Sequence, residues 1–320
     1  MTRSGDSSPL ALVRDHYSTG VQRAGFSEIP RIDVERWRAI RDQARREALT
    51  PLVIAGGVAQ STAVRNWSPR ELAKRFDITV DAAVDLPGGH APYMDDAEPH
   101  AARIPFSELV NRIEQGERCY LHQAPVENFE GLLDEIDLSD LTAVPPYFVS
   151  LWVGNNTRGG LHFDPADNVL AQIYGSKRAV LVAPKYLRAL RVLPDVPHKS
   201  GLSPEQIESE DDRALSRIER WRTTLDPGDV LYIPRGWWHY LASPGASISI
   251  NAWHGDVLPV KDWLRVFFRA GPRAWGRITR DFVWYGMLGR PYRQRLFSPP
   301  PMGVDLHRML VKKGELPPGV

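Results

Sequence analysis

The chain has 320 residues, of which 42% are hydrophobic, and its 40 basic and 39 acidic residues give a formal net charge of +1. This length and apolar content suit a protein that buries a sizeable core. The balanced charge argues against a nucleic-acid-binding field and against a polybasic membrane anchor, so we expect neither kind of partner.

A single cysteine, Cys119, makes an internal disulfide impossible, which suits a reducing compartment. The first residues contain no apolar segment of the kind found in signal peptides, and no run approaches 18 apolar residues. We therefore expect a cytoplasmic protein, with Cys119 as a buried strand residue.

The first third of the chain alternates helix and strand signals. Asp33 is a plausible N-cap for a helix over 34–49, and Ser68 followed by Pro69 marks the start of another helix. We also predict a short helix near 10–17, a buried strand over 51–56, a strand over 78–80, a loop over 86–104, a helix over 105–115 and a strand over 119–122.

From about 147 to 255 the pattern becomes that of short strands between turns. Such strands at close spacing indicate a β-sandwich or barrel. A polar insertion over 184–224 interrupts them, with helical character in 211–221, and residues 261–288 return to helix with many large apolar side chains, which suit a core or a dimer face. The predicted strands are 147–153, 160–163, 169–174, 178–182, 229–233, 239–242 and 247–253.

The most informative residues are His162 and Asp164, which lie two apart at the end of the strand predicted over 160–163. Residues two apart on a strand project to one face. His239 comes from another predicted strand of the same β region. Two imidazoles and one carboxylate can hold Fe(II) and leave three coordination positions open. An H-x-D pair also arises by chance, and a lone histidine is often a satisfied core residue, but the shared strand context favours a metal site.

Several polar side chains lie in or between apolar strands. Lys177 stands in a turn, where lysines are usually exposed, but inside a jelly roll it could pair with the carboxylate of an acidic co-substrate. Buried polar groups need partners. Tyr120, Asn168 and Asn251 are therefore candidates for co-substrate hydrogen bonds, although backbone groups could satisfy them equally well.

These residues occur in segments that resemble the JmjC and cupin-like Fe(II)/2-oxoglutarate dioxygenases. The likeness is greatest to the branch that contains the asparaginyl hydroxylase inhibiting hypoxia-inducible factor. It is strong over 147–256, weaker before it, and rests only on helical character in the last 60 residues. The segments that carry it are 161–164, 168–178, 226–234, 237–239 and 248–253.

The resemblance implies a mainly β fold with flanking helices and a double-stranded β-helix (jelly-roll) core. We expect this core over 119–256. Residues 1–118 would form a helical or mixed region packed on it, and 257–320 a helical region that joins two copies into a homodimer.

The resemblance also implies residue roles. His162, Asp164 and His239 would ligate the iron, and Lys177 with the Tyr120 hydroxyl would hold the distal carboxylate of 2-oxoglutarate. Asn168 and Asn251 would line the side near the iron, with Trp253 as a wall. The family often has Thr or Ser three residues before the first histidine, where this chain has Gly159. Thr157 is the expected replacement for co-substrate binding.

The implied function is hydroxylation of a C–H bond in a peptide or protein side chain, with 2-oxoglutarate and O2 as co-substrates and succinate and CO2 as products. Demethylation is a variant, because hydroxylating an N-methyl group releases formaldehyde. A free amino acid or a natural-product small molecule is an alternative substrate. Two other classes stay open: a non-catalytic cupin-like binding protein, and a metal-dependent hydrolase or isomerase, which would more often use H-x-H with a glutamate.

Overall fold

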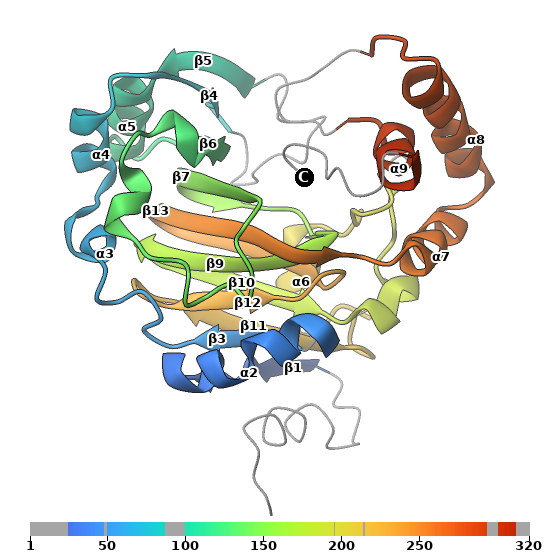
Figure 1. Ribbon diagram of the computed structural model, residues 1–320, viewed down its shortest axis with the longest axis horizontal. Helices are drawn as coiled ribbons and strands as arrows, with labels where there is room; N and C mark the ends of the chain where they lie inside the picture. Colours follow the sequence, from blue (N-terminus) through green and yellow to red (C-terminus); the bar gives the residue numbers. More distant parts are fainter. Residues whose placement is uncertain are drawn as a thin grey trace, which may run out of the picture.

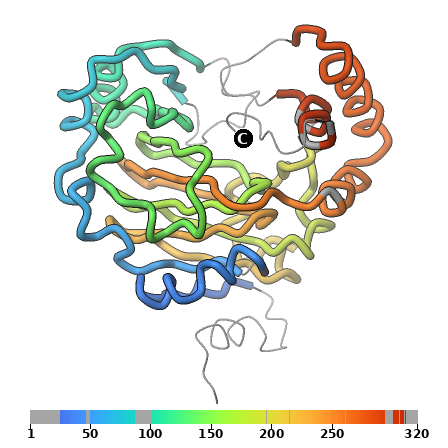
Figure 2. The backbone as a smooth tube through the Cα atoms, viewed as in Figure 1, coloured from blue at the N-terminus to red at the C-terminus, as the bar shows by residue number. Residues whose placement is uncertain are grey.

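The computed structural model describes residues 25–47, 50–86, 100–194, 196–213, 215–292 and 300–311. The helix expected near 10–17 and most of the loop expected over 86–104 lie outside these residues. Two layers of strands form the centre, helices from the first half of the chain cover one side, and the C-terminal helices stand at the opposite edge (Figures 1 and 2).

The larger layer is a mixed sheet through which the chain passes repeatedly. Strands from the middle and later parts of the chain form the centre of this layer. Strands from earlier in the chain lie at both of its edges. In spatial order they are β2 (Arg31–Ile32), β3 (Leu52–Ile54), β12 (Val230–Ile233), β9 (Ala166–Tyr174), β13 (Trp238–Val257), β7 (Phe148–Arg158), β6 (Tyr120–Pro125), β4 (Thr79–Ala83) and β5 (Ala101–Pro105).

The smaller layer is built on the first half of β13. There β13 pairs with β8 (His162–Phe163) and β10 (Lys177–Val182), and β10 leads on to β11 (Glu219–Leu225) and β1 (Gly25–Glu28). Because β13 belongs to both layers, the two layers are parts of one continuous hydrogen-bonded sheet. The predicted mainly β jelly-roll core is confirmed.

The sequence predicted two strands where the structure has the single strand β13. A β-bulge between Ser243 and Ala246 interrupts its pairing with β7. The bulge accommodates Pro244, which has no N–H to give to a ladder, so the strand bends there and continues. This bend carries β13 from the smaller layer into the larger one.

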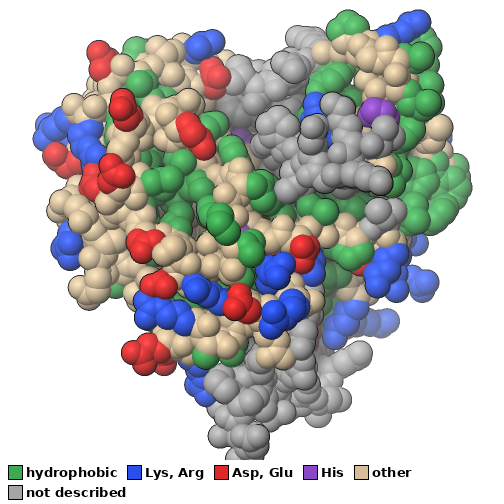
Figure 3. Space-filling view, in the orientation of Figure 1, with side chains coloured by type: hydrophobic (Ala, Val, Ile, Leu, Met, Phe, Trp, Pro, Cys, Tyr) green, Lys and Arg blue, Asp and Glu red, His purple; other side chains and the backbone are tan. Residues whose placement is uncertain are grey.

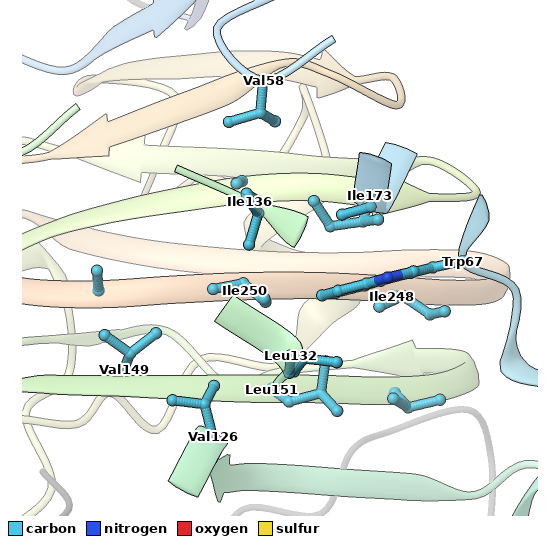
Figure 4. Packing of buried hydrophobic residues seen from close by; sticks show 14 of the residues in the cluster. Val58, Trp67, Val126, Leu132, Ile136, Val149, Leu151, Ile173, Ile248 and Ile250 are labelled. Atoms are coloured by element: carbon cyan, nitrogen blue, oxygen red, sulfur yellow. The ribbon is translucent and has the colours of Figure 1, made fainter. Parts of the chain in front are cut away.

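Alternation along the strands sorts side chains between the inside of the barrel and its outer face. On β13, Ile248 and Ile250 are fully buried in the hydrophobic cluster on the outer face, and Ser249 and Asn251, which alternate with them, point to the other side. Figure 4 shows these isoleucines packed with Leu151 and Trp67. The helices that cover this face are α2 (Val34–Glu47), α3 (Thr62–Asn66), α4 (Pro69–Arg75), α5 (Phe106–Glu114) and the 3-10 turns η3 (Val126–Asn128) and η4 (Leu132–Glu135).

The predicted helical region after the barrel is three consecutive pieces. Gly271, with φ of 88°, and Pro272 separate α7 (Val260–Ala270) from α8 (Pro272–Asp281), which continues as the π-helix η6 (Phe282–Met287). Glycine tolerates this positive φ, and proline suits the first turn of the next helix. A last helix, α9, spans Met302–Val311.

The helical character predicted for 211–221 is wrong. The insertion instead contains the 3-10 turn η5 (Pro184–Ala189), the short capped helix α6 (Pro204–Glu208) and turns, and β11 begins at Glu219. In β11, Trp221, Thr223 and Leu225 are buried and alternate with Arg222 and Thr224, which are exposed. That two-residue period suits a strand between β10 and β1.

Among the described residues, no helix combines the length and the apolar character needed to cross a membrane.

Candidate metal centre

Three potential metal ligands meet at the inner side of the barrel. His162 on β8 lies directly opposite His239 on β13, and Asp164 follows β8 by one residue. Their ligand atoms all lie within 4.8 Å of one another, with 3.8 Å from His162 Nε2 to Asp164 Oδ1 and 3.7 Å from His239 Nε2 to Asp164 Oδ2. The structure therefore brings the predicted triad together.

Both imidazoles are oriented by the backbone. His162 Nδ1 lies 2.9 Å from the Gly160 carbonyl oxygen and His239 Nδ1 lies 3.1 Å from that of Trp237. A carbonyl only accepts, so each Nδ1 carries the proton and each Nε2 lone pair faces the centre. Burial, with a contribution from His239, lowers the pKa of His162, although Asp164 opposes the shift. The neutral ring that a metal needs is thus favoured.

The carboxylate of Asp164 is held on one of its two oxygens. Oδ2 accepts a hydrogen bond from Trp253 Nε1 at 2.9 Å and another from Asn168 Nδ2 at 3.2 Å. Both donors are buried, so these bonds fix the carboxylate without competing water. The sequence placed Asn168 and Trp253 beside the co-substrate; here they contact a potential ligand.

Replacing Trp253 by phenylalanine tests this support. The substitution keeps an aromatic ring and removes the N–H donor, so we expect metal affinity to fall about 10- to 100-fold, as for other outer-shell partners of metal ligands. Calorimetric titration with Mn(II) measures the change. Trp67→Phe is the matched control, since Trp67 Nε1 donates over 3.0 Å to Glu135 outside the cluster. Equal losses in both variants would contradict the assignment.

Lys177 lies on the same inner face, at some distance from the triad. Residues 177, 179 and 181 share one face of β10, and Leu181 is paired with His239. Lys177 is 6% exposed and forms no ion pair with any described residue. Burial lowers its pKa to about 7. A buried lysine without a described ion partner fits the carboxylate of a bound ligand.

Tyr120 and Thr157 meet beside Gly154. A Cβ atom at Gly154 would lie 2.8 Å from Tyr120 Cδ2 and 3.3 Å from Thr157 Cγ2, so only glycine leaves room for both side chains. Burial raises the pKa of the Tyr120 hydroxyl far above its usual range, which keeps the proton available for donation. The two predicted contacts are therefore neighbours on the inside of the barrel.

Gly159 faces the backbone of β13. Its N–H donates to Leu241 O over 2.7 Å, and a Cβ there would lie 3.3 Å from the same oxygen. A side chain at this position would press on β13. The position usually filled by Thr or Ser is thus closed here, which favours Thr157 as its replacement.

Asn251 and Asn168 differ in whether their side-chain oxygens have hydrogen-bond partners. Asn251 Oδ1 accepts from Ser150 Oγ at 2.9 Å and from Trp152 Nε1. Asn168 Oδ1 is buried and has no hydrogen-bond partner in the described part of the chain. A buried acceptor of this kind implies a missing donor, such as a bound ligand or its water. The donor set and this orphaned oxygen fit a metal with a co-substrate beside it.

Sequence reasoning missed three residues that contact or pair with the predicted site residues. His122 follows Tyr120 by two positions, and its ring packs against Trp152 with 4.8 Å between centroids. Trp152 stands in turn between two core residues of β7. Alternation along both strands could have identified them. Lys199 carried no such signal, because it belongs to the polar insertion.

Comparisons with known proteins agree with this architecture. Residues 41–257 match the family described as cupin-like domain. The chain is 33% identical over 113 residues to Jumonji C domain-containing protein 5 of Drosophila melanogaster, covering 33% of this chain and 27% of that protein. It is 27% identical over 224 residues to Lysine-specific demethylase JMJ30 of Arabidopsis thaliana, covering 64% and 49%.

A third relative is tRNA wybutosine-synthesizing protein 5 of Gallus gallus, which is 24% identical over 259 residues, covering 70% of this chain and 76% of the relative. The chain thus spans less than half of the Drosophila and Arabidopsis proteins. The closer placement beside the asparaginyl hydroxylase branch stays a prediction. With two thirds of its length matched and a jelly roll that presents His162, Asp164 and His239 together, the chain belongs to the cupin-like, JmjC-containing family associated with Fe(II)/2-oxoglutarate oxygenases.

Proposed function

We propose that this protein is an Fe(II)- and 2-oxoglutarate-dependent dioxygenase that hydroxylates a C–H bond of a peptide or protein side chain. The observation that carries the proposal is one inner face with two oriented imidazoles, a fixed carboxylate and, farther along, a buried lysine. A non-catalytic cupin-like protein has no need of that complete set. A hydrolase or isomerase of the cupin kind would more often carry H-x-H and a glutamate.

In this proposal the chain's residues position the reactants. His162, Asp164 and His239 hold the iron, while Lys177, Tyr120 and Thr157 bind the distal carboxylate of 2-oxoglutarate. Asn168 offers its orphaned oxygen to the group beside the iron, and Asn251 lines the same side. When bound, Fe(II) with 2-oxoglutarate and O2 supplies the oxidising power for hydroxylation, with succinate and CO2 as products. The apolar walls keep water out.

The substrate stays open within this chemistry. Relatives named lysine-specific demethylases favour a protein side chain, and an N-methyl group is a target of the same reaction. A free amino acid or a natural-product small molecule is the alternative. We propose a cytoplasmic protein with no nucleic-acid or membrane partner, from its charge and cysteine content.

Succinate formation tests the function. Protein reconstituted with Fe(II) under anaerobic conditions is exposed to O2 and 2-oxoglutarate, and succinate is measured. Slow uncoupled turnover that disappears in the Asp164→Ala variant is the expected result. Iron binding without succinate, even with candidate peptides present, would support another cupin chemistry instead.

The affinity for 2-oxoglutarate is expected to depend on pH through Lys177. Only the ammonium form attracts a carboxylate, and burial places the pKa of Lys177 near 7 in the ligand-free protein. The dissociation constant is therefore expected to rise above pH 7, by at most about tenfold per pH unit. Titrations with the metal loaded at pH 6, 7 and 8 measure this. An affinity that rises with pH would contradict the assignment.

We propose that the C-terminal helices join two copies of the chain. Large apolar side chains are exposed there, including Phe268 at 61%, Met287 at 63% and Leu288 at 61%. Figure 3 shows hydrophobic side chains gathered along the edge formed by α7 and α8. Several large apolar side chains exposed in one region are typical of an interface. We propose the same three regions as the sequence analysis: an N-terminal region over 1–118, the jelly-roll core over 119–256 and a C-terminal helical region over 257–320.

The double substitution Met287→Asp, Leu288→Asp is expected to convert a dimer into a monomer, because two charges would enter the apolar contact. Truncation after Val257 is a poorer test, because it would also remove Trp263 of α7. This residue packs on Phe163 of the core with 5.5 Å between ring centroids. Light scattering measures the mass. Leu133→Asp, at a residue 41% exposed on η4, is the control. A double variant that keeps the wild-type mass would refute this interface.

A further inference from the structure

A cavity lies in the C-terminal helical region, and no residue of the metal centre lines it. Its volume is about 640 Å³, and all of its lining residues fall within 285–308. Cavities of about 300–1,000 Å³ are typical of small-molecule sites. The side chains that give this cavity its polar groups are Tyr285, Arg290, Tyr292, His307 and Arg308.

Two closely packed segments form the walls of the cavity. One is the end of the π-helix η6 with residues 289–292, and the other is α9, which packs on η6 (Figure 1). A Cβ atom at Gly286 would lie 2.6 Å from His307 Cβ, and one at Gly303 would clash with the backbone of Phe282. Glycine at both positions therefore lets the two segments approach closely. Phe282 also meets the His307 ring edge to face, with 5.3 Å between centroids, so the imidazole is held in place.

Arg290 has its guanidinium held beside the cavity. Its Cζ lies 4.2 Å from the centre of the Trp284 ring, and its backbone N–H donates to Trp284 O over 3.1 Å. Stacking covers one face of the guanidinium and leaves the N–H donors, which point outward in its plane, available to an oxyanion. Within the described ranges no ion pair involves Arg290.

Positive charge dominates the surroundings of the cavity. Its described lining contains two arginines and a histidine but no aspartate or glutamate. Over 257–320 the sequence has 12 lysines and arginines against 4 aspartates and glutamates, which gives +8, whereas the whole chain carries only +1. Asp281, an acidic residue that precedes η6, is paired with Arg280 over 2.6 Å. A region of one sign raises the local concentration of oppositely charged ligands.

Two tyrosines give the cavity an aromatic side. The ring centroids of Tyr285 and Tyr292 are 5.7 Å apart, and their planes are tilted by 59°. Val304, which is buried, adds apolar surface from α9. Aromatic rings pack on flat apolar groups, and a phenol O–H can donate to an oxyanion. The cavity thus combines a cationic part with an aromatic part.

We propose that this cavity binds a small organic anion. Its phosphate or carboxylate group contacts Arg290 and His307, and its planar apolar part packs against Tyr285 and Tyr292. A guanidinium matches either oxyanion with two parallel hydrogen bonds. The inference is independent of the oxygenase function proposed above, because none of these four residues belongs to the metal centre.

Calorimetric titration of the full-length protein at constant ionic strength tests the proposal. The probes are phenyl phosphate, benzoate, inorganic phosphate and phenol. Phenyl phosphate or benzoate is expected to bind at least about threefold more tightly than phenol, which has the ring without the charge. The same probe should also bind more tightly than inorganic phosphate, which has the charge without the ring. The tighter of the two organic anions identifies the oxyanion as phosphate or carboxylate.

Variants assign the binding to this cavity. Arg290→Gln is expected to weaken binding of the organic anion at least about threefold, the contribution of an exposed charged contact. Arg273→Gln, at an exposed arginine of α8, removes the same charge outside the cavity and should leave the affinity unchanged. Thermal unfolding is expected to give the wild-type melting temperature for both variants, since both positions are exposed.

Three results would overturn the proposal. The first is wild-type protein that binds neither organic anion, or binds both no better than phenol. The second is inorganic phosphate that binds as tightly as phenyl phosphate and benzoate, which would leave the aromatic side of the cavity without a role. The third is an equal loss of affinity in Arg290→Gln and Arg273→Gln, which would mean that the anion responds to overall charge and not to this cavity.

Discussion

Replacing His162 by alanine is expected to abolish turnover and to weaken Fe(II) binding more than about 100-fold, beyond the effect of removing an outer-shell partner. The residue supplies one of only three potential ligands in the cluster, and its ring is already oriented by the Gly160 carbonyl. Removal leaves two donors that cannot define one face of an octahedron. Metal content after anaerobic reconstitution and desalting measures the loss.

His307→Ala is the control for this experiment. His307 is a histidine of α9 that packs on Phe282 with 5.3 Å between ring centroids, away from the cluster. We expect it to retain wild-type iron content. Equal iron in His162→Ala and wild-type protein would mean that the cluster is not the metal site.

Replacing Lys177 by methionine is expected to weaken 2-oxoglutarate binding at least about 30-fold, since losing one member of a buried charged pair costs 2 kcal/mol or more. Metal affinity should be unchanged, because Lys177 lies away from the triad along β10. The ligand-free variant should be at least as stable as wild type, since it no longer buries a cation that has no described ion partner.

Calorimetry with Mn(II)-loaded protein gives the 2-oxoglutarate affinity, and thermal unfolding gives the stability. Lys185→Met, at an exposed lysine of the 3-10 turn η5, controls for the loss of positive charge. A Lys177→Met variant that binds 2-oxoglutarate normally would remove this lysine from the co-substrate site and direct attention to Lys199.

The triad was predictable because its signal is local. His162 and Asp164 are two residues apart, and the two-residue period of a strand places such a pair on one face without any knowledge of the rest of the fold. His239 needed only the expectation that its own strand belongs to the same barrel. The pattern of short strands predicted a β-sandwich or barrel, and the family resemblance implied the jelly roll.

Features that depend on distant pairing were not predictable. Lys199 lies opposite His162 only because residues 198–200 pair with β8, and nothing in the polar sequence around it indicates a strand. The hydrogen bonds from Asn168 and Trp253 to Asp164 likewise join β9 and β13. Alternation in β11 was visible, but its arginines and glutamate suggested a solvated helix. The segment is a strand because it pairs with β10 and β1, which the sequence around it does not indicate.

The most direct test of the central claim is an anaerobic titration of the protein with Fe(II) and 2-oxoglutarate, followed by visible absorption. A 2-oxo acid that chelates Fe(II) gives a charge-transfer band, which reports iron and co-substrate in one site. We predict a saturable band in wild-type protein, none in His162→Ala, and a band in Lys177→Met only at much higher 2-oxoglutarate. Wild-type protein that binds Fe(II) and shows no band at any 2-oxoglutarate concentration would contradict the account.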